Sequence, residues 1–174
     1  MIHLPLKKKE IQVFFEILKD GRIPDKHIAQ KIKTTQPTVT RIRQKLEREG
    51  YIQKYSPVVD FRKIGISIIV VTMFKWADYS VEKEQEDARK DILHMPELLS
   101  ISRGEGMRGK TNIIISAHRN FKSYEDFVRV LRKKWGHYVT DIESFISSVE
   151  GVTKIFDPSE CVIDILSKQE TEGV

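Results

Sequence analysis

The segment TQPTVTRIRQKLEREG, residues 35–50, carries the clearest structural signal in the chain. Thr35 is a residue type that caps helices, and Pro37 falls in the first turn, where a backbone N–H has no partner in any case. Gly50 can adopt the left-handed conformation that often ends a helix. The segment therefore predicts one helix that starts after Thr35 and continues to Glu49.

The two sides of this helix differ in chemistry. At about 100° per residue, Val39, Ile42 and Leu46 fall in one sector, which we expect to be buried. The other side is polar and basic, and Arg and Gln can read base edges in a DNA major groove through paired hydrogen bonds. We expect contacts with double-stranded DNA from these residues: Thr35, Gln36, Pro37, Thr38, Thr40, Arg41, Gln44, Lys45 and Arg48.

Roles within this set follow from position along the helix. The residues near its N-terminal end should reach deepest into the groove, because recognition helices usually enter that way. Lys45 and Arg48 lie further along and are better placed for phosphates, which position a protein without reading sequence. The alternative is an ordinary surface helix with solvated charges.

Two shorter helices are predicted before this one. Apolar residues recur at helical spacing over residues 6–19, and residues 26–32 follow with Asp25 as the expected cap. Together with the third helix they form a helix-turn-helix pattern. After Gly50, residues 51–55 alternate in polarity like a short strand, which predicts a wing with Lys54 as a further phosphate contact.

Charge is distributed unevenly along the 174 residues. Residues 1–55 contain 13 Lys/Arg and 6 Asp/Glu, a net charge of +7, whereas the remainder contains 17 and 19, a net charge of −2. The basic character therefore belongs to the first third of the chain. Such asymmetry predicts a small polyanion-binding module joined to a near-neutral domain.

A second domain is predicted from the alternation of strands and helices after residue 65. The expected order is a strand at 66–74, a helix at 80–94 capped by Ser80, strands at 98–103 and 112–118, a helix capped by Ser123 with Asp126, and a strand at 139–149. This βαββαβ order is the ferredoxin-like unit. The sequence Asp157-Pro-Ser-Glu160 then predicts an extra C-terminal helix.

The predicted fold class is therefore α+β, in four parts. A winged helix-turn-helix domain covers residues 1–55, a linker 56–65, a ferredoxin-like domain 66–156, and a C-terminal helix with a tail 157–174.

Two stretches resemble known regulators. PTVTRIRQKLEREGYI, residues 37–52, resembles the recognition helix and wing entry of bacterial and archaeal winged-helix regulators. GYIQKYSPVVDFRKIG, residues 50–65, resembles the helix-to-linker junction of the Lrp/AsnC (leucine-responsive, feast/famine) family, and a weaker resemblance extends to about residue 150. Ile42 stands four residues before Leu46, where that family usually has Arg, and in this detail the helix is more similar to the MarR type. The resemblance implies that the second domain pairs subunits through its sheet and senses a small molecule.

The glycine-rich loop has two interpretations. Residues 104–111 match the phosphate-binding pattern G-x-x-x-x-G-K-[ST], but that chemistry needs a helix after the loop, and NIIISA at 112–117 favours a strand. The resemblance instead implies an effector site on this hairpin, where the family carries G-x-x-D and this chain has Gly109 or Asn112 at the acidic position. The expected effector residues are Gly106, Met107, Arg108, Gly109, Lys110 and Asn112. Because the family's carboxylate is missing, the basic residues of this loop favour an anionic ligand or no ligand. The alternative is a mobile basic hairpin loop with no binding role.

Other chemistry is not expected. The five His residues are scattered and Cys161 is the single cysteine, so we expect no metal, no disulfide and no cofactor. No nucleophile motif is present, so an enzyme is not expected. The chain has no apolar run of ~20 residues and no signal peptide, which predicts a cytoplasmic protein that does not bind membranes.

The sequence thus favours a sequence-specific DNA-binding transcription regulator that acts as a homodimer or higher oligomer on a palindromic operator, with a small-molecule effector. The alternatives are a nucleotide-binding protein that uses Gly104–Thr111 and an RNA-binding module in the second domain, although residues 66–74 lack the alternating aromatic residues that such a sheet needs.

Overall fold

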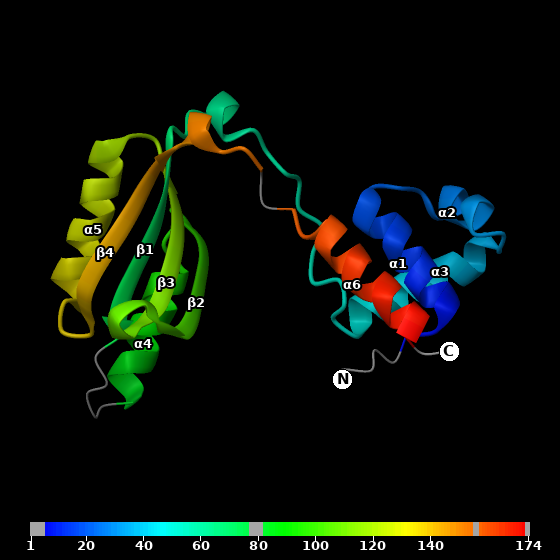
Figure 1. The fold of residues 1–174 in the computed structure, drawn as a ribbon, viewed down its shortest axis with the longest axis horizontal. Coiled ribbons are helices and arrows are strands. Elements are labelled where there is room, and N and C mark those ends of the chain that lie inside the picture. The colour runs from blue at the N-terminus through cyan, green and yellow to red at the C-terminus, as the bar shows by residue number, and fades with distance from the viewer. Residues whose placement is uncertain (1–5, 77–81, 155–156, 173–174) are drawn as a thin grey trace. The chain divides into compact units, whose positions relative to one another are not determined.

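The computed structural model describes residues 6–76, 82–154 and 157–172, and the chain divides into two compact units (Figure 1). The N-terminal unit combines Met1–Val58 with Phe156–Val174, and the sheet unit consists of Val59–Ile155. The end of the chain therefore returns to the unit in which it began.

The N-terminal unit is helical. Its helices are α1 (Lys8–Lys19), α2 (Asp25–Lys31), α3 (Gln36–Arg48) and α6 (Ser159–Glu172). Val13, Ile28, Val39 and Leu46 are fully buried in its core. The apolar face of each helix supplies this core, as the helical spacing of the sequence predicts.

The ends of α3 confirm the caps expected for the decisive segment. Thr35 Oγ1 accepts a hydrogen bond from the backbone N–H of Thr38 at 3.4 Å, and Pro37 lies in the first turn. Gly50 has φ +78°, a backbone conformation that residues with a Cβ rarely adopt. The buried seam of α3 is Val39, Ile42 and Leu46, also as predicted.

The expected cap of α2 is wrong. Pro24 occupies the N-cap position and Asp25 is the first residue of the helix. The carboxylate of Asp25 instead binds Thr40 and Arg43, both on α3. A stronger tertiary interaction has replaced the local one that the sequence suggests.

The predicted wing strand is also wrong. Residues 51–55 form no strand in the described structure. The side chains of Tyr51 and Ile52 pack against the helical core, and the Tyr55 hydroxyl donates to Glu47 at 2.9 Å. The alternating polarity thus reflects a segment that lies across the helices, while Lys54 stays exposed.

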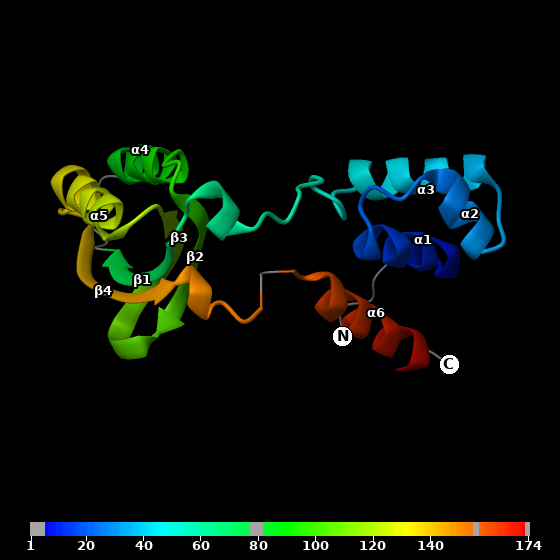
Figure 2. The same ribbon diagram turned by 90° about the horizontal axis from the view of Figure 1, so that it is seen from above.

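The extra C-terminal helix is present as α6. The Asp157 carboxylate accepts the N–H of Ser159 at 2.9 Å, which satisfies a backbone donor at the helix start. Leu166 is 4% exposed and, with Val162, packs into the core of the N-terminal unit. Figures 1 and 2 both show α6 beside α1.

The sheet unit has the predicted ferredoxin-like order. Its elements are η1 (Phe61–Ile64), β1 (Ile68–Trp76), α4 (Glu82–Leu93), β2 (Leu98–Gly106), η2 (Met107–Gly109), β3 (Lys110–His118), α5 (Phe121–Trp135), β4 (Val139–Ser148) and η3 (Val149–Gly151). The four strands form one antiparallel sheet in the order β2-β3-β1-β4.

The cap of α5 differs from the one expected. Asn120, rather than Ser123 with Asp126, holds the N-cap position, and its side chain accepts the backbone N–H of Ser123 at 2.9 Å. Ser123 Oγ in turn accepts the N–H of Asn120, so the pair forms a reciprocal capping box. The expected cap of α4, Ser80, lies outside the described residues.

The two faces of the sheet have different surroundings. Helices α4 and α5 lie on one face (Figure 2), where Val70, Phe74 and Ile114 pack with Phe127 and Leu131. The opposite face, here called the open face, carries side chains that alternate with these along each strand. Among them are three register neighbours, Val71, Ile115 and Phe145, of which Phe145 is 69% exposed.

In the part of the chain that the structure describes, no helix combines the length and the apolar character needed to cross a bilayer.

Candidate nucleic-acid interface

The outward side of α3 is a shallow hollow. It is lined by Gln36, Pro37, Thr40, Arg41 and Gln44. All five were expected as DNA contacts from the sequence, and α3 brings them together because they share the side opposite its buried seam. Hydrogen-bond donors and acceptors thus line one exposed surface about two and a half turns long.

Two cations of α3 are free to meet a partner. Arg41 is exposed and forms no ion pair with a described residue. The Arg48 side chain is 73% exposed and lies 3.9 Å from Glu49 Oε1, a distance at which an exposed pair contributes little. Both guanidinium groups can therefore exchange water for phosphate or base contacts.

Lys45, expected to bind phosphate, takes part in a contact within the domain. Its ammonium lies 2.8 Å from Glu10 Oε1 on α1, and its side chain is 27% exposed. The hydrogen bond to Glu10 raises the pKa of Lys45. In this arrangement Lys45 joins α3 to α1.

The hydroxyls on α3 are partly engaged as well. Thr40 Oγ1 donates to Asp25 Oδ2 at 2.6 Å, and the hydroxyls of Thr35 and Thr38 lie 2.8 Å apart. These contacts fix the side-chain positions at the N-terminal end of α3.

Arg43 is a positioning residue that sequence reasoning missed. Its guanidinium donates to Asp25 Oδ1 at 2.7 Å, to the Ile23 carbonyl at 2.8 Å and to the Tyr55 hydroxyl at 3.2 Å. Burial lowers the pKa of Arg43, but the hydrogen bonds to Tyr55 and Asp25 raise it by more. Its partners lie 12 to 20 residues away, so no local pattern could have identified this role.

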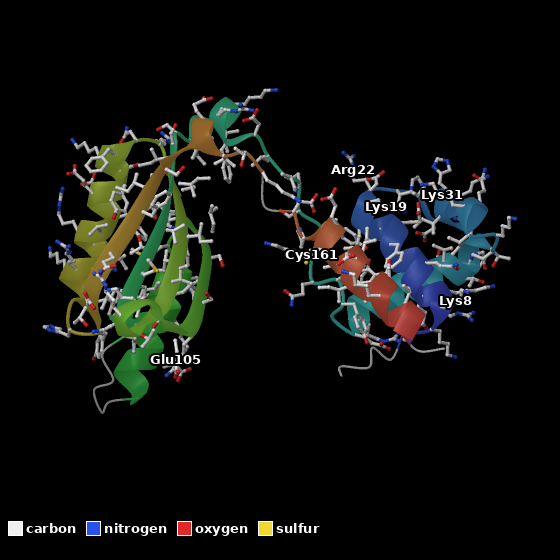
Figure 3. All side chains as sticks on the ribbon, in the orientation of Figure 1. Lys8, Lys19, Arg22, Lys31, Glu105 and Cys161 are labelled. Carbon is white, nitrogen blue, oxygen red and sulfur yellow. The ribbon has the colours of Figure 1, made fainter. Side chains whose placement is uncertain are left out.

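Further basic side chains of the N-terminal unit are exposed. Lys8, Arg22 and Lys31 project outward from the N-terminal unit (Figure 3), and Lys54 is exposed after α3. Lys31 forms an ion pair with Glu16 at 2.6 Å. The surplus of positive charge in the first 55 residues is therefore at the surface.

The residues expected at an effector site lie on the β2–β3 hairpin. Gly106 ends β2, Arg108 and Gly109 form the turn with φ +62° and +77°, and Lys110 begins β3. The side chain of Met107 lies outside the described residues. The hairpin is thus tighter than the glycine-rich sequence suggests.

Lys110 is not an exposed cation in this hairpin. Its side chain is 3% exposed, and its ammonium lies 2.7 Å from Asp141 Oδ1 and 3.3 Å from Glu143 Oε1. Burial lowers the pKa of Lys110, and these two carboxylates raise it by more. Arg108 also lies 3.9 Å from Glu143, so acidic side chains of β4 balance the basic side chains of the loop.

The phosphate-loop alternative lacks its geometry. The residues that follow Gly109 form strand β3, so no helix N-terminus stands behind the loop to bind a phosphate. Lys110 is also held by carboxylates rather than directed into the loop.

Among the described residues, no group of three His, Cys, Asp or Glu side chains could hold a metal ion.

Comparison of sequences identifies the first domain. Residues 6–53 match a family described as winged helix-turn-helix DNA-binding. The chain is 35% identical over 78 residues to the HTH-type transcriptional regulator LrpC of Bacillus subtilis strain 168, a match that covers 44% of this chain and 54% of LrpC. The chain thus spans about half the length of the curated relative that it matches.

Solved structures share the fold of both units. An AsnC family transcriptional regulator from Agrobacterium tumefaciens has a TM-score of 0.75 at 16% identity, covering 86% of this chain and 94% of that one. The regulator NMB0573 of Neisseria meningitidis, solved with L-Met, has a TM-score of 0.73 at 16% identity, covering 87% and 92%. The structure of B. subtilis LrpC has a TM-score of 0.69 at 19% identity, covering 88% of this chain and 99% of that one.

These similarities agree with the resemblance that the sequence itself suggests, and the C-terminal helix α6 is present in addition to the βαββαβ unit. The α+β fold of this chain is thus similar to that of solved Lrp/AsnC-type regulators, and its first domain matches a winged helix-turn-helix DNA-binding family.

Proposed function

We propose that this protein is a cytoplasmic transcription regulator that binds duplex DNA through α3. The observation that carries the proposal is the exposed side of α3, where Arg41 and Gln44 line a hollow next to the freely exposed Arg48. Arg and Gln match the edges of guanine and adenine in a major groove. The match of residues 6–53 to a DNA-binding family supports the same proposal.

The proposed contacts divide by position. Thr35, Gln36, Pro37, Thr38, Thr40, Arg41 and Gln44 face the bases, and Arg48 and Lys54 face the phosphates. Lys45 contacts a phosphate in this proposal only if DNA displaces Glu10 from the Lys45 ammonium.

The protein acts as a homodimer in this proposal. The open face presents Val71, Ile115 and Phe145, apolar side chains that water contacts unfavourably in a single subunit. Pairing two open faces would remove them from water and bring two copies of α3 to one DNA. Half-sites about 34 Å apart then make the operator an imperfect palindrome. Assembly beyond a dimer remains compatible with this arrangement.

Modulation by a small molecule completes the proposal. The supporting observation is that the N. meningitidis regulator with the same fold was solved with L-Met. The expected effector residues are those of the β2–β3 hairpin: Gly106, Met107, Arg108, Gly109, Lys110 and Asn112.

A duplex-DNA selection on the purified protein at two salt concentrations tests the proposal. We expect one enriched palindrome and an affinity that falls steeply as salt rises, because bound cations release counterions from the phosphates. Binding without an enriched sequence contradicts sequence-specific regulation. Failure to bind any duplex contradicts the role of α3, and binding of RNA by residues 59–155 would instead support the RNA-binding alternative.

The first prediction separates base contacts from phosphate contacts. Arg41→Ala should lower the ratio of specific to random affinity, since a paired contact to a base contributes about 1–3 kcal/mol of discrimination. Arg48→Ala should weaken the binding of all DNA sequences alike and make the salt dependence of the affinity shallower. Fluorescence anisotropy with operator and scrambled duplexes measures both, and equal losses on both duplexes for both variants contradict the division.

A further inference from the structure

A separate cavity of about 220 Å³, partly open to solvent, lies between α4 and the sheet. Ile92 and Leu93 of α4, Trp76 of β1 and Ile101 of β2 form its apolar lining. This volume is below the ~300–1,000 Å³ typical of drug-sized ligands, so it suits a metabolite. Of the hairpin residues discussed above, Asn112 lines it.

The orientation of Asn112 is fixed by its neighbours. Thr111 Oγ1 accepts the backbone N–H of Trp76 at 2.8 Å, so its own hydrogen is free to donate to Asn112 Oδ1 at 2.9 Å. With its oxygen engaged, the Asn112 amide presents its nitrogen, which carries two hydrogens. The side chain therefore offers donors to an occupant of the cavity.

Arg103 supplies charge to the same cavity. It lies next to Asn112 in the β2–β3 register and forms no ion pair with a described residue. Ser102 is the remaining polar residue of the lining, and no described residue that lines the cavity carries a carboxylate. Among its described lining residues, the cavity therefore offers a cation, N–H donors and an apolar wall, and no counter-charge for an ammonium group.

We infer that this cavity binds a small carboxylic acid with an apolar body and no ammonium group, the class of the 2-oxo acids. The carboxylate pairs with Arg103, the oxo group accepts from Asn112, and the side chain of the acid packs against Trp76 and Ile101. An amino acid of the same skeleton would place its ammonium among described lining residues that carry no anionic group, which is unfavourable. The inference rests on the effector-modulated function proposed above.

Calorimetric titration of the full-length protein without DNA tests the inference. The probes are two matched pairs, 4-methyl-2-oxopentanoate against L-leucine and phenylpyruvate against L-phenylalanine. We expect saturable binding of at least one 2-oxo acid, at least about 10-fold tighter than its amino acid, since an ammonium group that loses water without gaining an anionic partner costs at least this much. Equal or tighter binding of both amino acids, or no saturable binding of either acid, overturns the inference.

Two variants locate the site. Arg103→Gln should lower the affinity for the 2-oxo acid about 10- to 100-fold. The control Arg132→Gln makes the same change at an exposed position of α5 and should leave this affinity unchanged. Asn112→Asp replaces donors by a carboxylate and should remove the preference for the 2-oxo acid. Wild-type affinity in Arg103→Gln overturns the inference.

DNA affinity, measured on the same samples, separates the two claims. If the protein binds DNA but neither 2-oxo acid, the cavity inference is contradicted and the proposed DNA-binding function is not. Binding of acid by a protein that binds no DNA contradicts the proposed function and leaves the cavity assignment in place.

Discussion

Asp25 illustrates how one side chain can orient a helix. Its two carboxylate oxygens accept from Thr40 at 2.6 Å and from Arg43 at 2.7 Å, and both partners lie on α3. The side chains of Asp25 and Arg43 are only 18% and 17% exposed, so water screens the pair weakly. The position of the proposed DNA-binding surface therefore depends on a residue that need not touch DNA.

Asp25→Asn should lower the free energy of unfolding by about 1–3 kcal/mol, because it leaves a partly buried guanidinium without its charged partner. Urea unfolding followed by circular dichroism measures the loss. Glu49→Gln is the matched control, since Glu49 lies 3.9 Å from its cationic neighbours and should change stability by less than about 0.5 kcal/mol. Equal effects of the two changes contradict the positioning role.

Glu10 makes a pH-dependent contribution. Burial raises the pKa of Glu10, but hydrogen bonds from the Lys45 ammonium and the Lys7 backbone lower it by more, so the net pKa is below its ordinary value of 4.5. The stabilisation is therefore full above about pH 4.5 and is lost as pH falls through the lower pKa of the folded state.

Glu10→Gln should consequently destabilise the protein at pH 7, by about 1 kcal/mol or more, and much less at pH 3. Urea unfolding at a series of pH values gives the difference between variant and wild type. A difference that stays constant from pH 7 to pH 3 would contradict the ion pair with Lys45.

At the scale of elements, α6 joins the first and last parts of the chain. It follows β4 in sequence, yet it supplies Val162 and Leu166 to the core built by α1, α2 and α3. The sheet unit is thus connected to the N-terminal unit at both of its ends.

Leu166→Ala should destabilise the N-terminal unit by about 2–4 kcal/mol, because it opens a cavity under α6. Ile165→Ala is the control on the same helix, and it should have a much smaller effect because Ile165 is 50% exposed. Thermal and urea unfolding compare the two variants. Similar small losses for both would show that α6 adds little to this core.

At the scale of the whole molecule, the two units carry different surfaces. The first 55 residues have a net charge of +7, whereas the open face of the sheet unit exposes apolar side chains. The proposed DNA contacts and the proposed dimer contacts thus lie in different units of the chain.

Phe145→Lys should convert the proposed dimer into a monomer, because it places a charge in an apolar interface. Phe121→Lys is the matched control, since Phe121 is 54% exposed at the start of α5, away from the open face. Analytical ultracentrifugation measures both masses. A Phe145→Lys dimer as stable as the wild type would exclude the open face as the interface.

The sequence by itself determined the elements whose physics is local. Helical spacing, the Thr35 cap, Pro37 and the left-handed Gly50 fix α3, and the βαββαβ order follows from polarity patterns and turn residues. The side of α3 that faces outward also follows, because burying Val39, Ile42 and Leu46 leaves the Arg and Gln side chains on the surface.

The tertiary structure decided what depends on residues distant in sequence. Asp25 became an anchor for Arg43 rather than a cap, Lys45 was paired with Glu10, and Lys110 was buried between carboxylates of β4. Tyr51 and Ile52 pack against the helical core where the sequence suggests a strand, and α6 returns to the first unit. Each outcome depends on charges or apolar surfaces that folding alone brings together, and local periodicity carries no information about them.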